Sequence, residues 1–312
     1  MKKITFLATA VAVVCLMAGC QKDGKYTPKE KISKIYNESS YTNSYFDGEE
    51  WQTESDGSGK QLSEVWTWDG KMVSQIAYMD EGEAYNTIKF TYDGKQLAEA
   101  SDGEKRMVFT YDGKKLEKIE MFAKNTTEAQ MVMTFERDGK KISKIIMTSN
   151  GEWDKKGAMS RLQRLAFAGI LPESRVVDRM MKDVCARAAK ADRTVTYSLT
   201  WDGDNVSKFS GTMDGESMTV SFSYDDKNNP TQGFLFALVE GEYYGTECFS
   251  ENNVTKIVYT YSDGSESESN EESFTYTYDG NWPLTRTSTY SYGSEAEGYR
   301  YEYKEITYYE YE

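Results

Sequence analysis

Short stretches of alternating aromatic and polar residues, each followed by a turn sequence, recur along most of the chain. The copies lie at 66–76 (WTWDGKMVSQI), 90–100 (FTYDGKQLAEA), 109–119 (FTYDGKKLEKI), 134–145, 199–209, 222–230 and 276–285. Alternation with a period of two places every second side chain on the same face of a β-strand. Asp-Gly is a preferred pair for tight hairpin turns, because Gly adopts a positive φ without strain. Each copy therefore predicts a β-hairpin.

The apolar residues after each turn break the alternation. Leu116 follows the Asp112-Gly113 pair, and the next apolar residue, Ile119, comes three positions later. A β-bulge adds one residue to one strand and would restore the parity. We expect the first apolar residue to cover the turn and the second to rejoin the buried face through such a bulge.

A segment of different character interrupts the repeats at residues 155–193, which are rich in Ala, Met and basic residues. From Pro172 its apolar positions follow the spacing of an amphipathic helix, and a shorter helix is predicted over 158–168. We expect a two-helix insert at about residues 157–191 whose apolar stripe covers the sheet. The alternative is that its basic side chains contact an anionic membrane or a partner.

These patterns together predict a mainly β fold. The repeats resume with the same sequence after the insert, so residues 34–312 are expected to form a single repeat-built domain. We predict a long antiparallel meander of about 12 to 16 strands, strongly curved or forming a half-barrel. The two-helix insert would pack on one face of this sheet.

The N-terminus has the features of an export signal. Lys2 and Lys3 precede a short apolar stretch, and Ala18-Gly19 precede Cys20. Residues 1–19 resemble a bacterial lipoprotein signal peptide, although Met17 stands where Leu is usual. The resemblance implies that Cys20 is acylated and becomes the first mature residue, anchoring the protein to a membrane. Residues 20–33 are polar and are expected to form a tether.

The residues after Cys20 indicate the destination. Gln21 resembles the outer-membrane sorting pattern, and Lys22-Asp23 resembles the short charged signal that sends lipoproteins of the Bacteroidota to the cell surface. We therefore expect an outer-membrane lipoprotein of the cell envelope that faces the periplasm or the cell surface.

Composition excludes several classes of function. The chain has no His and a formal net charge of −14, which becomes −16 once the two lysines of the signal are removed. The absence of His rules out catalysis by a Ser-His-Asp triad, and the negative charge argues against nucleic-acid partners. Cys185 and Cys248 remain in an oxidising compartment that permits a disulfide, but we favour two buried thiols.

Candidate chemistry is sparse. Glu117, Glu136 and Glu240 lie on predicted strands, but nothing marks a catalytic pair. Asp202–Asn205 and Asp225–Asn229 gather oxygen ligands suited to calcium, yet tight turns require the same residues. We predict no catalytic residue, no metal and no cofactor. The aromatic rows are expected to be mostly core, with exposed tyrosines near the C-terminus as a binding platform.

The chain resembles the YD-repeat-like lipoproteins of the Bacteroidota, a family defined as a domain of unknown function. The resemblance rests on the Gly19-Cys20 lipobox, the YDG turns, YDDKNNP at 224–230 and the closing YTYDGNWPLTRTSTYSYGSE. It implies an antiparallel β fold in the cell envelope, with no catalytic residue to transfer.

We predict a lipid-anchored, non-catalytic envelope protein that binds or adheres to a glycan or protein through its β-sheet surface. The alternative is a carrier that holds a lipid or another hydrophobic ligand in a cavity between the curved sheet and the insert.

Overall fold

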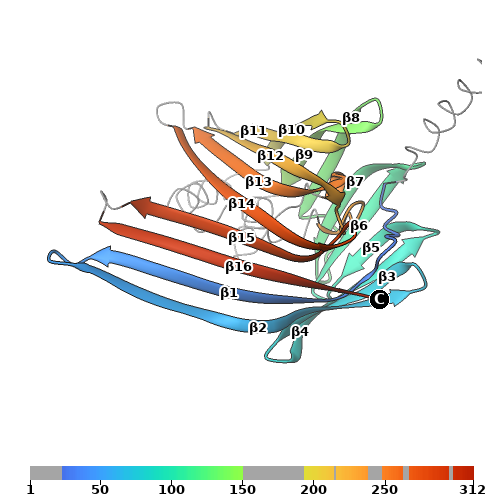
Figure 1. Cartoon of the computed structure of the whole chain (residues 1–312). Helices are drawn as coiled ribbons and strands as arrows, with labels where there is room; N and C mark the ends of the chain where they lie inside the picture. Colours follow the sequence, from blue (N-terminus) through green and yellow to red (C-terminus); the bar gives the residue numbers. More distant parts are fainter. Residues whose placement is uncertain (1–22, 150–192, 214–215, 238–247, 263–266, 295–297) are drawn as a thin grey trace, which may run out of the picture.

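The computed structural model describes residues 23–149, 193–213, 216–237, 248–262, 267–294 and 298–312 (Figure 1). Within these ranges the chain forms a closed barrel of sixteen antiparallel strands. The strands are β1 Ile32–Phe46, β2 Trp51–Asp69, β3 Met72–Asp80, β4 Glu83–Asp93, β5 Gln96–Ser101, β6 Lys105–Asp112, β7 Lys115–Ala123, β8 Met131–Asp138, β9 Lys141–Ser149, β10 Arg193–Asp202, β11 Asn205–Met213, β12 Glu216–Asn228, β13 Asn252–Ser262, β14 Ser267–Asp279, β15 Trp282–Ser294 and β16 Tyr299–Tyr311.

Closure of the sheet corrects the predicted open or half-barrel meander. The first strand pairs with the last, in a register that runs from Ile32 opposite Tyr311 to Tyr45 opposite Tyr299. This pairing satisfies the backbone groups of both strands, which would otherwise form exposed sheet edges. The predicted insert at 157–191 lies outside the described residues, whose elements are all strands. The described residues contain no helix that is long and apolar enough to cross a bilayer.

The hairpin turns and the bulges are confirmed at six of the seven copies, but the prediction is wrong at 222–230, where Asp225 and Asp226 lie within β12 and the next described strand begins at Asn252. Gly70, Gly94, Gly113, Gly139, Gly203 and Gly280, the glycines of the Asp-Gly turns, all have φ between +53° and +61°. After the turn between β6 and β7, Asp112 pairs with Lys115 and Tyr111 with Leu116, but Thr110 pairs with Lys118. The extra residue is the expected bulge. It returns Ile119 to the face that Leu116 occupies, and both side chains are buried.

Substitution of Gly113 by Val should destabilise the barrel by about 1–3 kcal/mol, because a β-branched residue is strained at φ +59°. Equilibrium denaturation measures this loss. Gly59→Val is the matched control, since Gly59 lies within β2, its φ is not positive and an added Cβ meets no atom within 4 Å. Equal stability of the two variants would contradict the strained-turn assignment.

The inner face of the barrel is apolar. In β10, Tyr197 and Leu199 are buried, whereas the alternate residues Thr196, Ser198 and Thr200 are exposed. Buried side chains from strands all around the barrel belong to one cluster, which identifies their face as the inside. Several are methionines: Met107, Met121, Met131, Met133 and Met218.

The outer face is polar and charged. Ion pairs join neighbouring outward side chains, such as Lys118 with Glu120 at 2.9 Å and Lys256 with Glu271 at 2.7 Å. Hydroxyl pairs do the same elsewhere, as between Thr277 and Thr285 at 2.7 Å. This distribution is the reverse of a membrane-spanning barrel, whose outward band is apolar.

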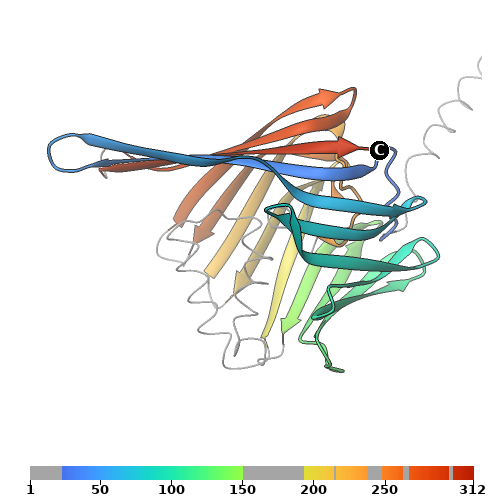
Figure 2. The ribbon, with the colours of Figure 1, turned by 90° about the horizontal axis from the view of Figure 1, so that it is seen from below.

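Four long strands project from the barrel. Strands β1, β2, β15 and β16 have 13 to 19 residues each, whereas β5 has only six. Figures 1 and 2 show these strands running together beyond their neighbours and ending in the β1–β2 turn. We call this projection, formed by residues 36–64, 288–294 and 299–306, the arm.

Candidate functional site

The barrel has two unlike ends. The repeat turns at 69–72, 93–96, 112–115, 138–141, 202–205 and 279–282 all lie at the same end, because they join each even-numbered strand to the next strand of the antiparallel meander. We call this the turn end. The connections at 46–51, 80–83, 101–105 and 123–131 lie at the opposite end, which we call the arm end because it carries the tip of the arm.

Hydrogen bonds from tyrosine side chains link neighbouring hairpins at the turn end. Tyr92 Oη donates to the Val73 carbonyl at 2.8 Å, and Tyr111 Oη donates to the Leu97 carbonyl at 2.8 Å. In each case the donor precedes an Asp-Gly turn, and the acceptor is the first buried apolar residue after the preceding Asp-Gly turn. Burial raises the pKa of both tyrosines above its ordinary value. These aromatic side chains were predicted to be core, but their hydrogen bonds to backbone carbonyls were not predicted.

Residues 23–31, which the sequence analysis assigned to the tether, are docked on the turn end. Tyr26 is only 2% exposed, and its ring lies 4.9 Å from the ring of Phe234 and 5.8 Å from that of Trp68. Its hydroxyl donates to the Pro230 carbonyl at 2.6 Å. The segment approaches so closely that a Cβ on Gly24 would lie 2.0 Å from Tyr111 Oη. The barrel thus holds the chain a few residues after Cys20.

Asp23 fixes the start of this segment. Its backbone N–H donates to the Lys114 carbonyl at 3.0 Å, and its carboxylate accepts the Leu116 N–H at 2.6 Å and pairs with Arg137. Burial raises the pKa of the Asp23 carboxyl, opposed by the Leu116 hydrogen bond and by Arg137. Arg137 stands where other repeats have an aromatic residue, so the variant repeat supplies the cation for this contact.

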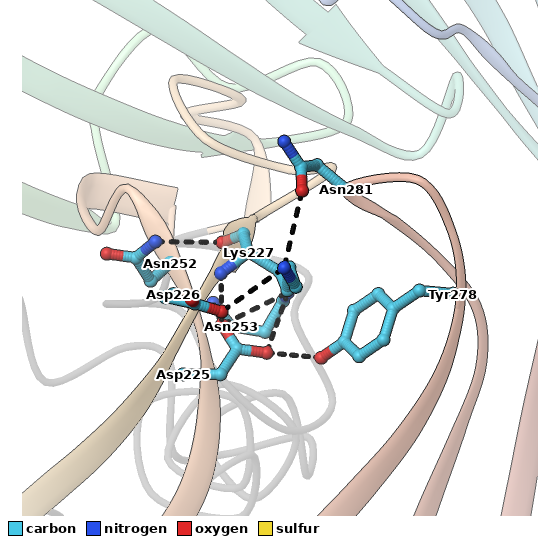
Figure 3. Close-up of polar contacts among 7 residues, drawn as sticks. All are labelled: Asp225, Asp226, Lys227, Asn252, Asn253, Tyr278 and Asn281. Carbon is cyan, nitrogen blue, oxygen red and sulfur yellow. Dashed lines mark hydrogen bonds and ion pairs between the residues drawn. The ribbon is translucent and has the colours of Figure 1, made fainter.

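Asp225, one of the candidate calcium ligands, links strands β12, β13 and β14 through hydrogen bonds (Figure 3). Its Oδ1 accepts the backbone N–H groups of Lys227 at 2.9 Å and Asn253 at 3.1 Å. Its Oδ2 accepts the Tyr278 hydroxyl and lies 3.2 Å from Asn253 Nδ2. The protein's own donors occupy both oxygens, and Asp225 to Asn228 form the end of β12 rather than the expected tight turn. In the described part of the chain, no three His, Cys, Asp or Glu residues group as metal ligands.

The other candidate residues do not converge on a site. Glu117 and Glu136 are both exposed, and Glu240 lies outside the described residues. Cys248 is buried, but Cys185 also lies outside the described residues, as does Cys20. The disulfide and the lipidation of Cys20 stay predictions.

The arm carries a cluster of exposed aromatic side chains. Six large hydrophobic side chains are exposed among the described residues, and four of them belong to the arm: Tyr41, Tyr45, Phe46 and Trp51. Phe46 and Trp51 face each other across the β1–β2 turn, with ring centroids 6.0 Å apart. Clustered exposed apolar groups of this kind mark interaction surfaces in soluble proteins. Tyr41 and Tyr45 lie an odd number of residues from Phe46 along β1, so their side chains point to the other face of the ribbon. We call Phe46 and Trp51 the aromatic tip.

The turn beside the aromatic tip is ordered and acidic. Asp47 Oδ1 accepts the backbone N–H groups of Glu49 and Glu50, each at 2.9 Å, and Gln52 Nε2 donates to Asp47 Oδ2 at 2.9 Å. The Glu50 and Glu49 hydrogen bonds hold the pKa of the Asp47 carboxyl below its ordinary value. The turn therefore presents rings next to carboxylates in a fixed arrangement. Exposed tyrosines were expected near the C-terminus, whereas the exposure of Phe46 and Trp51 was not predicted.

No protein-family model matches the chain, and a comparison with curated proteins finds no match. Among solved structures, a porin-like protein of Bacteroides uniformis is similar over 90% of this chain and 98% of its own, with 10% identity and a TM-score of 0.45. A porin-like protein of Bacteroides vulgatus covers 91% and 99%, with 10% identity and a TM-score of 0.31. Because both TM-scores are below 0.5, function must be inferred from this chain's own residues.

Proposed function

We propose that the protein is a lipid-anchored, non-catalytic protein of the bacterial cell envelope that binds carbohydrate through its aromatic tip. The observation that carries this proposal is the pair of exposed rings, Phe46 and Trp51, that face each other beside an ordered acidic turn. The resemblance of residues 1–20 to a lipoprotein signal supports the location. The predicted kinship with YD-repeat-like lipoproteins remains part of the proposal.

The polar outer face supports anchoring by lipid rather than by membrane-spanning strands. Outward positions of β12 are Ser217, Thr219, Ser221 and Ser223, and other strands carry Lys and Glu. A Lys or Arg on the lipid face of a membrane barrel costs about 2–4 kcal/mol at the bilayer midplane. The outer face of the barrel is therefore compatible with water rather than lipid, and the acyl chains on Cys20 would attach the protein to the membrane.

Cys20→Ser should release the protein from membranes, because the thiol that carries the acyl chains is lost. Fractionation of cells that express the variant measures the soluble and membrane-bound shares. Cys185→Ser is the matched control and should stay with the membrane. Continued membrane association of Cys20→Ser would refute the anchor. Protease treatment of intact cells then separates a surface location from a periplasmic one.

Carbohydrate suits the chemistry of the aromatic tip. The flat faces of Phe46 and Trp51 offer apolar area for stacking against the C–H face of a sugar ring. The neighbouring carboxylates of Glu49 and Glu50 are acceptors for the hydroxyl groups at the edge of such a ring, whereas the Asp47 oxygens already accept hydrogen bonds within the turn. Little order has to be gained on binding, because the β-ladder and the Asp47 hydrogen bonds already fix the turn.

Trp51→Ala is expected to weaken glycan binding by about 10- to 100-fold. An aromatic side chain that the bound ligand covers contributes about 1.4–3 kcal/mol to the free energy of binding. A glycan array probed with the full mature chain identifies the ligand, and calorimetry measures the loss. Tyr85→Ala, which removes an exposed ring away from the arm, should bind normally. Binding of peptides in place of glycans, or equal binding by both variants, would contradict the assignment.

The carrier hypothesis is less well supported. The inward apolar side chains of the described strands are nearly all covered: Met121 is 2% exposed and Met107 is 3% exposed. Side chains that line an open chamber for a lipid would be more accessible. The burial therefore favours a filled core and supports a binding surface on the outside of the barrel.

A further inference from the structure

The turn end of the barrel is the end nearest to the predicted anchor. Asp23 is hydrogen-bonded to Lys114 and Leu116 at the turn between β6 and β7. Cys20 precedes it by three residues. A fully extended chain spans at most about 3.6 Å per residue, so the acylated residue lies within about 11 Å of Asp23. The glycerol backbone of the lipid is therefore held close to this end of the barrel.

The turns that surround Asp23 are a basic part of the turn end, whereas the turns at 202–205 and 279–282 at the same end carry three aspartates and no lysine. The four turns at 69–71, 93–95, 112–115 and 138–141 contain six lysines and four aspartates. Lys71, Lys95, Lys114 and Lys115 are exposed. The connections at the arm end of these strands, 47–50, 80–83, 101–105 and 123–130, contain nine acids and only two lysines. The half of the barrel formed by β2 to β9, to which Asp23 is bound, is thus polarised along its axis within a chain of net charge −14.

We infer that the turn end, through Lys95 and Lys114, sits on the anionic headgroups of the membrane that holds the anchor. An anionic surface attracts nearby lysines and repels carboxylates, and each lysine near such a surface shifts the population of the seated orientation about fivefold. The acidic arm end is then directed away from the membrane. This inference rests on the lipid anchor of the proposed function.

The orientation has a consequence for binding. Strand β3 alone has nine residues, so at about 3.3 Å per residue it separates the two ends by about 30 Å. The arm extends beyond β3, β4 and β5 at the end away from the turns (Figure 2). The seated barrel would therefore present the aromatic tip well clear of the headgroups, where a large glycan can reach it.

Fluorescence quenching by lipid-linked quenchers tests the orientation. Asp112→Cys and Glu83→Cys place a label at the turn end and at the arm end, with the same change of charge, in a Cys185→Ser/Cys248→Ala background. The acylated full mature chain is reconstituted into vesicles of phosphatidylethanolamine and phosphatidylglycerol with quenchers on the headgroups. We expect several-fold stronger quenching of the label at 112. Equal quenching at both positions, or stronger quenching at 83, would overturn the inference.

Charge variants separate headgroup recognition from a passive effect of the short linker. Lys95→Gln/Lys114→Gln, which removes two positive charges, should lower the ratio of seated to unseated protein on the order of 25-fold, whereas Lys105→Gln/Lys124→Gln at the arm end should leave the quenching ratio unchanged. An unchanged ratio for the first variant would overturn the role of the lysines. Failure of the anchor is distinguishable, because an unacylated protein would show no quenching at either label and would not co-sediment with vesicles.

Discussion

At pH 11 the free energy of unfolding is expected to be about 7 kcal/mol lower than near pH 8, because five tyrosines are buried with their protons. Burial raises the pKa of each of these phenols above its ordinary value near 10. They are Tyr26, Tyr92, Tyr111, Tyr197 and Tyr311. The unfolded chain ionises near pH 10, so above that pH the folded chain binds more protons than the unfolded chain.

The sign of the effect follows from this difference in bound protons. The contribution of each raised pKa to stability is fully present below pH 10 and is lost as the pH rises toward the folded value. A phenol that stays protonated at pH 11 costs about 1.4 kcal/mol relative to its unfolded counterpart. Five such groups approach the total stability of many domains, about 5–15 kcal/mol. The barrel should therefore unfold cooperatively in mild alkali.

Denaturant titrations at a series of pH values, followed by tyrosinate absorbance, measure this loss. Tyr92→Phe/Tyr111→Phe removes two of the five groups, so its stability should depend less steeply on pH above 10. Tyr85→Phe is the control, because Tyr85 is 68% exposed and contributes no burial of a phenol. A stability that stays constant between about pH 9 and pH 11 would show that the buried hydroxyls titrate normally.

The hairpins could be predicted because their determinants are local. Asp112 and Gly113 specify the turn by backbone conformation alone, and the spacing of Leu116 and Ile119 records the bulge that follows it. Six of the seven copies of this sequence repeat the same information along the chain. The strand count, within the predicted range, follows from the same repeats and needs no knowledge of distant contacts.

Barrel closure could not be predicted in this way, because it depends on contacts between the two ends of the sequence. Tyr45 pairs with Tyr299 and Ile32 with Tyr311, and no local sequence pattern in either strand identifies the strand with which it pairs. The long alternating runs of β1 and β16 were visible, but an open sheet needs the same alternation. Matched polar side chains, such as Lys31 and Glu312 at 2.9 Å, become evident only once the strands are paired.

The candidate site was harder still to find from sequence. Tyr26 is the single aromatic residue between Cys20 and Ile32, and its polar neighbours are typical of a tether. Phe46 and Trp51 flank a turn outside the repeats, so the repeat pattern gave no reason to single them out. Phe46 lies an odd number of residues from buried Ile35 along β1, so it and its partner Trp51 are on the outer face of the ribbon.

Tyr26→Ala should destabilise the protein by about 3–5 kcal/mol and release residues 23–31 from the turn end. The substitution removes a ring that is 2% exposed and packs against Trp66, Trp68 and Phe234. Aromatic truncations in cores typically cost this much, since the cavity does not close fully. Denaturant titration measures the stability, and hydrogen exchange of the Leu97 amide, which donates to the Gly24 carbonyl at 2.9 Å, reports release of the segment.

Tyr26→Phe separates packing from hydrogen bonding at the same position. It keeps the ring and loses only the donor to the Pro230 carbonyl, so it should cost about 1–2 kcal/mol and leave the Leu97 amide protected. Similar losses in both variants would assign the stabilisation to the hydroxyl. A freely exchanging Leu97 amide in the wild type would mean that the segment is not docked. The chain from Cys20 to Ile32 would then act as a flexible linker, and the turn end would no longer be confined to the membrane surface.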